Sequence, residues 1–239
     1  MCNPSRLPSQ ELKRFDEDAH LVAFLGDLKL QQGHAILDVG CGFGAKLRLL
    51  GSRGFNVVGV DLNEEAIGAN RAAGFECVLP KEFDETDKTY DIVLMSHIIE
   101  HFAPAELLEF MDHYLDRLKC GGHLIVITPL MWPCFYDDFD HVKPYHPEGM
   151  SSVFCADRAQ VQFKARNRLK LQRLAFRRTA FRVSRTSWLQ SGRGGRALCR
   201  IMDWMLGCLY LVSGGFISRA NGWVGLFQKV SQDAGGKRA

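Results

Sequence analysis

The chain has 239 residues, of which 46% are hydrophobic and 24% are charged, and its formal net charge is +3. This composition is ordinary for a folded globular protein, and it excludes a chain that is disordered throughout. The length suits a single domain over residues 1–239 with an elaborated end.

The small net charge hides a strong segregation of charge along the chain. Between Arg158 and Arg200 there are thirteen Lys or Arg residues and no acid, whereas the remainder has seventeen basic and 27 acidic residues, a net charge of −10. This asymmetry indicates either an anionic partner for the basic segment or a solvated helix surface.

Cysteine spacing and the distribution of apolar residues indicate the cellular compartment. None of the eight cysteines forms a CxxC pair or a zinc-site spacing, which favours a reducing environment. Residues 1–20 are polar and lack an apolar signal core, so we expect a cytoplasmic protein. The longest uncharged apolar run, Trp204 to Ser218, is shorter than the roughly 20 residues that span a bilayer. It predicts a core helix or an interfacial helix.

Strand and helix patterns alternate through the first 130 residues. Apolar residues recur at helical spacing from Leu12 to Leu28, so an N-terminal helix is expected within residues 10–32. Strands are predicted at 35–39, 55–60, 75–79, 91–95 and 123–128, and helices at 45–52, 64–73 and 104–119. Continuous apolar strands that alternate with helices predict an α/β fold, in which a parallel sheet is covered by helices on both faces.

Beyond residue 130 the pattern loosens. Residues 131–185 are expected to form a loop and the sixth-strand region. Within it, Val161, Phe163 and Ala165 alternate with polar residues like a strand, and residues 169–181 fit either a strand or a helix. A basic and apolar helical insertion is predicted at 186–221, with its clearest helix at 197–211, and the last strand is predicted at 222–230.

A glycine-rich loop follows the first predicted strand, in the sequence DVGCGFG at residues 38–44. Glycines allow a sharp turn and a close approach of ligand to backbone, and the helix that follows offers unpaired N–H groups. The second strand ends at Asp61, whose carboxylate suits both hydroxyls of a ribose; the alternative role is a helix cap. The third glycine comes one residue too early for a dinucleotide loop, and Asp38 suits an ammonium group better than a pyrophosphate. The loop therefore favours a nucleoside that carries an amino acid over NAD.

Four segments together resemble a known family. ILDVGCGFG at 36–44 and VVGVDLNEEAI at 57–67 resemble the first two motifs of class I methyltransferases. YDIVLMSHIIEHF at 90–102 and LKCGGHLIVITP at 118–129 are similar to the later motifs of the ubiquinone-biosynthesis O-methyltransferase type. The resemblance covers residues 34–130, more loosely to Glu148, and implies that this segment is the cofactor-binding core. It implies a Rossmann-like, seven-stranded, mostly parallel sheet and S-adenosylmethionine as the cofactor.

The resemblance also assigns residues to this cofactor. It implies contacts with the methionine part (Asp38, Gly40, Gly42), the ribose (Asp61), the adenine (Leu62) and the region of the sulfonium (Met95, Ser96). Family members usually have an acidic residue after the third strand, near the adenine, and here PKEFD at 80–84 offers either Glu82 or Asp84.

Histidines gather where chemistry is expected, just after the fourth strand. His97 and His101 stand in HIIEH, and a loop after the fifth strand adds His141 and His146. The same letters match a zinc metalloprotease motif, but that motif needs a long flanking helix, whereas Pro104 follows closely. The cluster is either structural, a general base toward a hydroxyl, or a metal site. His97, His101 and His141 are the candidate catalytic residues.

The metal alternative rests on the resemblance. The arrangement resembles the metal site of small-RNA 2′-O-methyltransferases and the divalent-cation site of the ubiquinone type. Those families place Glu-x-x-Glu-His at this point, and here His97 replaces the first Glu. An imidazole in that place suits a transition metal better than magnesium.

The expected function is methyl transfer from S-adenosylmethionine to a hydroxyl of a small-molecule acceptor that is lipid-like, quinone-like or glycosyl. The alternatives are an RNA methyltransferase of the same fold and a non-catalytic protein that binds the cofactor. Four arginines precede Trp188 and the apolar run: Arg177, Arg178, Arg182 and Arg185. This pattern fits an anchor on the anionic inner face of a membrane or a lid over an apolar acceptor. No RNA-binding module is recognisable, so nucleic acid ranks last among the expected partners.

Overall fold

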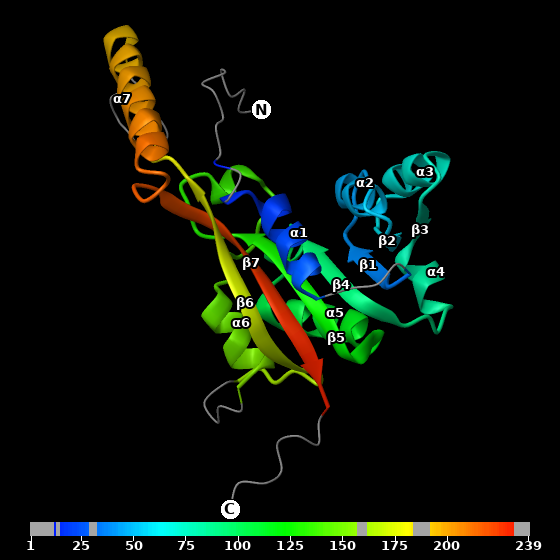
Figure 1. Cartoon of the computed structure of the whole chain (residues 1–239). Helices are drawn as coiled ribbons and strands as arrows, with labels where there is room; N and C mark the ends of the chain where they lie inside the picture. Colours follow the sequence, from blue (N-terminus) through cyan, green and yellow to red (C-terminus); the bar gives the residue numbers. More distant parts are fainter. Residues whose placement is uncertain (1–11, 13–14, 29–32, 157–161, 184–191, 232–239) are drawn as a thin grey trace, which may run out of the picture.

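A seven-stranded sheet organises the computed structural model, which describes residues 12, 15–28, 33–156, 162–183 and 192–231 (Figure 1). The strands are β1 (Ala35–Val39), β2 (Asn56–Val60), β3 (Glu76–Val78), β4 (Tyr90–Ser96), β5 (Leu118–Pro129), β6 (Arg168–Thr179) and β7 (Arg219–Val230). Their order is β3-β2-β1-β4-β5-β7-β6. Strands β1 to β5 pair in parallel, and β7 is antiparallel to both of its neighbours. The predicted Rossmann-like, seven-stranded, mostly parallel sheet is confirmed.

Helices cover both faces of this sheet. They are α1 (Glu17–Asp27), α2 (Ala45–Gly51), α3 (Glu64–Ala72), α4 (Pro80–Asp84), α5 (Pro104–Asp116) and α6 (Pro147–Phe154). A further helix, α7 (Arg193–Val212), projects away from the sheet (Figure 1). Successive residues of a strand point to opposite faces. In β1, Ile36 packs in the core cluster of α1, α2 and α3, and Leu37 packs in the cluster of α4, α5 and α6. Two apolar cores therefore fix the strand ends that carry the site.

The strand expected around residues 161–165 is wrong. Residues 162–167 lie outside any strand, Val161 falls outside the described residues, and β6 begins only at Arg168. The backbone N–H groups of Arg166 and Asn167 donate to the Asp112 carboxylate, at 2.8 and 3.0 Å. This segment thus bonds to α5 instead of to a neighbouring strand, although its side chains alternate. The ambiguous residues that follow are a strand, because β7 pairs with them as far as Thr179.

The helix expected at 104–119 is too long. Helix α5 ends at Asp116 and β5 already begins at Leu118, which pairs with Tyr90 of β4. The N–H of Tyr90 donates to the Arg117 carbonyl at 2.9 Å. Pairing with β4 therefore begins before Gly121, where the helix was expected to have ended. Two short helices, α4 and α6, were not expected from the sequence, and both begin with proline.

The predicted helical insertion between the last two strands contains α7, which projects from the end of the β6–β7 hairpin (Figure 1). Its inner side holds buried Tyr210 and Asp203; Asp203 accepts a hydrogen bond from the Val183 N–H at 2.6 Å. Its outer side exposes an apolar row: Leu198, Ile201, Met205, Leu209 and Val212. Arg185 and Trp188 lie outside the described residues. In the part of the chain that is described, no helix has both the length and the apolar character to cross a membrane.

Candidate functional site

The glycine loop joins β1 to α2 at the carboxyl edge of the sheet. Gly40, Gly42 and Gly44 all have positive φ, at 76°, 48° and 78°. A Cβ on Gly40 would lie 2.9 Å from the Ile98 side chain, whereas a Cβ on Gly42 would meet nothing within 4 Å. Gly40 is therefore required by packing, and Gly42 leaves bare backbone that a ligand can approach closely.

Asp38 is a buried carboxylate without a partner. Its exposed fraction is 1%, and among the described residues neither carboxylate oxygen has a hydrogen-bond partner. Burial raises the pKa of Asp38 to about 7, although the Lys46 ammonium favours the ionised form. A buried polar group without a partner is costly, and its persistence at a site needs an explanation. The ammonium group of a ligand would give the Asp38 carboxylate a partner, and the predicted cofactor carries such a group.

Asp61 ties the glycine loop to the end of β2. Its Oδ2 accepts from the Gly42 N–H at 2.7 Å, and its Oδ1 accepts from the Asn63 N–H at 2.8 Å. The cap of α3 is Asn63, whose side chain accepts from two N–H groups of the first turn. Asp61 therefore remains directed at the loop, and each of its oxygens can accept a further hydrogen bond from a hydroxyl. The neighbouring Leu62 is 82% exposed, so its apolar surface is open to a nucleobase.

The other residues that the sequence predicts to contact the cofactor differ in accessibility. Met95 is fully buried in the core, and the half-buried Ser96 is the residue that reaches the surface at the end of β4. Glu82 accepts from the Leu79 N–H and pairs with Arg71 at 2.6 Å. Asp84 pairs with His113 at 3.0 Å. Since both acids already have partners, the structure does not choose between them for the adenine.

His97 follows β4 and, among the non-glycine residues described, alone has a positive φ, of 55°. Its Nε2 lies 2.9 Å from the Glu17 carboxylate, and its Nδ1 lies 3.3 Å from Glu100. Burial opposes protonation, but the hydrogen bonds to Glu100 and Glu17 outweigh it and raise the pKa of His97 to about 9. While these contacts persist, His97 is an imidazolium at neutral pH and a poor proton acceptor.

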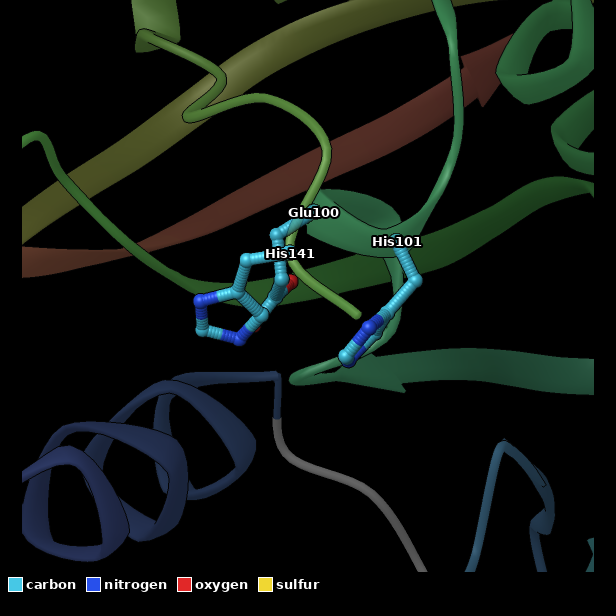
Figure 2. A group of neighbouring side chains, drawn as sticks. All are labelled: Glu100, His101 and His141. Atoms are coloured by element: carbon cyan, nitrogen blue, oxygen red, sulfur yellow. The ribbon is translucent and has the colours of Figure 1, made fainter. Parts of the chain in front are cut away.

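Glu100, His101 and His141 come together at the other histidine site (Figure 2). One ligand atom from each lies within 4.8 Å of the others, and the two imidazole rings are 5.0 Å apart. Glu100 is fully buried and accepts from the Thr128 hydroxyl at 3.0 Å. The Nδ1 atoms of His101 and His141 face main-chain carbonyls, at 3.1 and 2.6 Å. Because a carbonyl only accepts, Nδ1 of each ring carries a hydrogen, and in the neutral form of the ring Nε2 then carries the lone pair.

This arrangement can do two things chemically. A neutral imidazole with a free Nε2 lone pair can remove a proton from a hydroxyl. Two imidazoles with one carboxylate can also hold a divalent transition metal. His146 stands apart from this cluster, because its side chain accepts from the Glu148 N–H and caps α6.

A cleft of about 500 Å³ opens beside the histidines. Its lining comprises His97, Pro129, Trp132, Cys134, Asp137, Asp138, Phe139, His141 and Arg177. His97 and Pro129 mark the carboxyl ends of β4 and β5, where a ligand is expected in a sheet of this kind. The sequence did not single out Trp132, and it marked Arg177 only as one of the arginines that precede the apolar run, without placing it at the cleft. Arg177 was one of thirteen basic residues in its segment, and only the pairing of β6 with β7 brings it to the cleft.

Comparisons with known proteins agree with this architecture. A family described as methyltransferase domain matches residues 11–190. Ubiquinone biosynthesis O-methyltransferase from Rhizobium etli is 34% identical over 105 residues, 41% of this chain and 42% of the relative. The mitochondrial ubiquinone biosynthesis O-methyltransferase of Homo sapiens is 34% identical over 108 residues, 40% of this chain and 29% of the relative. The chain thus spans less than half the length of these curated relatives.

Solved structures extend the likeness to almost the whole fold. A SAM-dependent methyltransferase from Archaeoglobus fulgidus has a TM-score of 0.54 at 21% identity, covering 92% of this chain and 97% of that one. Magnesium protoporphyrin IX methyltransferase from Synechocystis has a TM-score of 0.55 at 12% identity, covering 96% and 87%. At these identities the likeness shows the shared fold.

Proposed function

Because the chain belongs to the methyltransferase domain family, as a class I enzyme that depends on S-adenosylmethionine, we propose that it methylates a hydroxyl oxygen of a small-molecule acceptor. The acceptor is lipid-like, quinone-like or glycosyl. The observation that carries this proposal is the cleft itself, since His141 lines it and its Nδ1 faces the Phe135 carbonyl, which leaves the lone pair of the neutral ring on Nε2, 3.6 Å from Asp138. The name of the curated relatives, which are O-methyltransferases, supports transfer to oxygen.

The cofactor residues set the position of the reacting centre. S-adenosylmethionine supplies a methyl group that is already activated on a sulfonium, so the protein needs to orient the acceptor and accept its proton. Asp38 pairs with the ammonium of the methionine part, and Asp61 accepts hydrogen bonds from the ribose. The bare backbone at Gly42 admits the cofactor to the loop.

The acceptor hydroxyl gives its proton to the Nε2 of His141 or of its neighbour His101. His97 does not serve this step while Glu17 holds it protonated. A second candidate is favoured by the grouping of Glu100, His101 and His141. These residues would hold a divalent transition metal, which would polarise the acceptor oxygen as a Lewis acid.

Incubation of the purified chain with labelled S-adenosylmethionine and a cell extract tests the proposed function. We expect the label in a small, organic-soluble product, with an Asp61→Ala variant as the inactive control. Label in RNA would establish the RNA alternative instead. If nothing is labelled and calorimetry detects no binding of S-adenosylmethionine, the assignment as an enzyme is refuted.

We also propose that α7 rests on an anionic membrane surface. Leu198, Ile201, Met205, Leu209 and Val212 recur at helical spacing along one exposed face. Arg193, Arg196 and Arg200 are exposed in the first half of the same helix. By helical periodicity these arginines fall on the opposite side of α7 from the apolar row. A helix with one apolar face and one basic face is the pattern of a helix that lies in a membrane interface. Charge complementarity favours anionic lipid, because the segment from Arg158 to Arg200 contains no acid.

Vesicle flotation tests this docking. The protein is expected to float with vesicles that contain phosphatidylserine, to remain unbound with neutral vesicles, and to dissociate at high salt. Ile201→Asp with Met205→Asp should reduce flotation by about tenfold or more, since both side chains are more than half exposed on the apolar face. Phe139→Asp, which alters an apolar residue that is even more exposed and lies away from α7, is the control. A dimer that these α7 substitutions dissociate, without any flotation, would show that a second copy covers the face instead.

A further inference from the structure

One carboxylate at the start of α1 joins three cationic side chains. Oε1 of Glu17 lies 3.0 Å from the Lys46 ammonium. Oε2 of Glu17 lies 2.9 Å from Nε2 of His97 and 2.6 Å from a guanidinium nitrogen of Arg177. The three cationic groups come from α2, from the end of β4 and from β6. Segments that are distant in the sequence therefore meet on a single anionic group.

Two of these three groups belong to the cleft. His97 and Arg177 line it, whereas Lys46 does not and has Asp18 as a second partner. The guanidinium of Arg177 is held along one side, where Nε donates to the side chain of Asn221 at 3.1 Å and Nη2 to its carbonyl at 3.4 Å. Its remaining nitrogen points to Glu17. A fixed guanidinium beside an imidazole presents two donors to one oxyanion, as in charge-assisted binding of carboxylate or phosphate.

We propose that Arg177 and His97 form a subsite for an anionic group of the methyl acceptor, a carboxylate or a phosphate, and that the Glu17 side chain occupies this subsite until the acceptor displaces it. This inference rests on the proposed function, since it names the chemical class of the acceptor. Displacement needs only a rotation of Glu17, the first residue of α1, because Leu21, Phe24 and Leu25 anchor the rest of the helix in the core. After rotation, Glu17 can keep Lys46 as its partner.

The charges that line the cleft favour one orientation of the bound acceptor. At the His141 end the cleft is lined by Asp137 and Asp138, and Asp138 lies 3.6 Å from Nε2 of His141. An anionic group is repelled from that end and attracted to Arg177. The acceptor hydroxyl is then the part that faces His141. A neutral acceptor gains nothing from displacing Glu17, so the subsite selects for charge.

Calorimetry on the full chain saturated with S-adenosylhomocysteine tests the subsite, with benzoate and inorganic phosphate as probes. Glu17→Gln removes the internal anion, so it should strengthen binding of at least one probe by about tenfold. Adding Arg177→Gln to this variant should abolish the gain. Asp18→Asn is the matched control, because Asp18 contacts Lys46 but neither group of the subsite. Benzyl alcohol, the neutral counterpart of benzoate, should bind all variants equally.

The same titrations separate the acceptor from the cofactor as the source of the anion. If benzoate competes with S-adenosylhomocysteine, the subsite belongs to the carboxylate of the cofactor. The same holds if Glu17→Gln changes the affinity for S-adenosylhomocysteine but not for 5′-methylthioadenosine, which lacks that carboxylate. Either result overturns the proposal, as does a Glu17→Gln variant that binds both probes like the wild type. A chain that never binds S-adenosylhomocysteine refutes the proposed function instead, and the probes then report on the subsite by themselves.

Thermal unfolding of each variant verifies that it is folded. Should Glu17→Gln fail to fold, Arg177→Gln is compared with the wild type at high benzoate concentration. The proposal then requires this variant to bind benzoate about tenfold more weakly. Equal affinity would contradict it.

Discussion

Asp38→Asn is expected to weaken S-adenosylmethionine binding about 100-fold while the protein remains folded. The substitution keeps the size of the side chain but removes the charge that we propose to pair with the ligand ammonium. Loss of one partner of a buried charge pair typically costs a factor of this order. Calorimetric titration measures the change. Asp91→Asn is the control, because Asp91 lies at the opposite end of β4 and pairs with Lys119 at 2.8 Å. Equal affinity of the wild type and of Asp38→Asn for S-adenosylmethionine would show that Asp38 is not the partner of the ligand ammonium.

The raised pKa of Asp38 also predicts how the stability of the unliganded protein depends on pH. The pKa of Asp38 is raised to about 7 from an ordinary value of 3.8, chiefly by burial. A raised carboxyl pKa contributes stability that is fully present below the unfolded value and is lost as pH rises through the folded value. The stability of the unliganded protein should therefore fall as the pH rises from about 4 to about 7. At pH 8, Asp38→Asn should unfold at a higher temperature than the wild type without ligand.

Cofactor affinity should follow the opposite course. Since the ammonium pairs with the ionised carboxylate, binding by the wild type should strengthen as pH rises toward and through about 7 and then level off. In Asp38→Asn this titration should disappear. A pH profile that is identical in both proteins would assign the titration to another group.

His141→Ala is expected to lower the rate of methyl transfer by about 100-fold or more, with little change in S-adenosylmethionine affinity, because a positioned base contributes about that much. Single-turnover transfer of a labelled methyl group to the identified acceptor measures it. His146→Ala is the matched control, since His146 caps α6 and stands apart from the histidine cluster. Full activity in His141→Ala would leave His101 as the candidate base, and full activity in both His141→Ala and His101→Ala would leave the histidine cluster with a structural role.

Chelation separates the two candidate chemistries at that cluster. If His141 or His101 acts as the base, 1,10-phenanthroline leaves the wild-type rate unchanged. If a transition metal acts there, the chelator abolishes transfer and added metal restores it. Glu100→Gln should then lose as much activity as His141→Ala, because both remove a ligand from the same group of three.

The sequence predicted the first 130 residues well because their signals are local. Apolar runs, glycine stops and the Asp38–Gly44 loop each depend on neighbours in the chain, and the seven-stranded, mostly parallel sheet followed from the family resemblance. The misleading alternation at Phe163 and Ala165 shows the limit of such patterns. The backbone N–H groups of Arg166 and Asn167 donate to the buried Asp112 carboxylate on α5. The spacing of apolar residues in the sequence contains no information about this contact.

The cleft was less predictable, because contacts across long sequence separations assemble it. His97, His141 and Arg177 come from three separate parts of the chain, and Glu17 reaches Arg177 across 160 positions. The sequence marked the histidines as candidates but gave no sign that Glu17 would keep His97 protonated. Such an effect depends on the distance between two side chains, which only the packing of α1 against the sheet determines.

The direction of β6 has a consequence for how an acceptor travels. This strand pairs antiparallel to β7, which is itself antiparallel to β5, so β6 runs the same way as β1 to β5 and ends on the edge that carries the glycine loop. Helix α7 follows β6 in the chain and projects from this end of the β6–β7 hairpin (Figure 1). With α7 resting on lipid, the reactive edge of the enzyme would face the bilayer. A hydrophobic substrate could then be taken up and its product returned by lateral diffusion, without ever dissolving in the surrounding water.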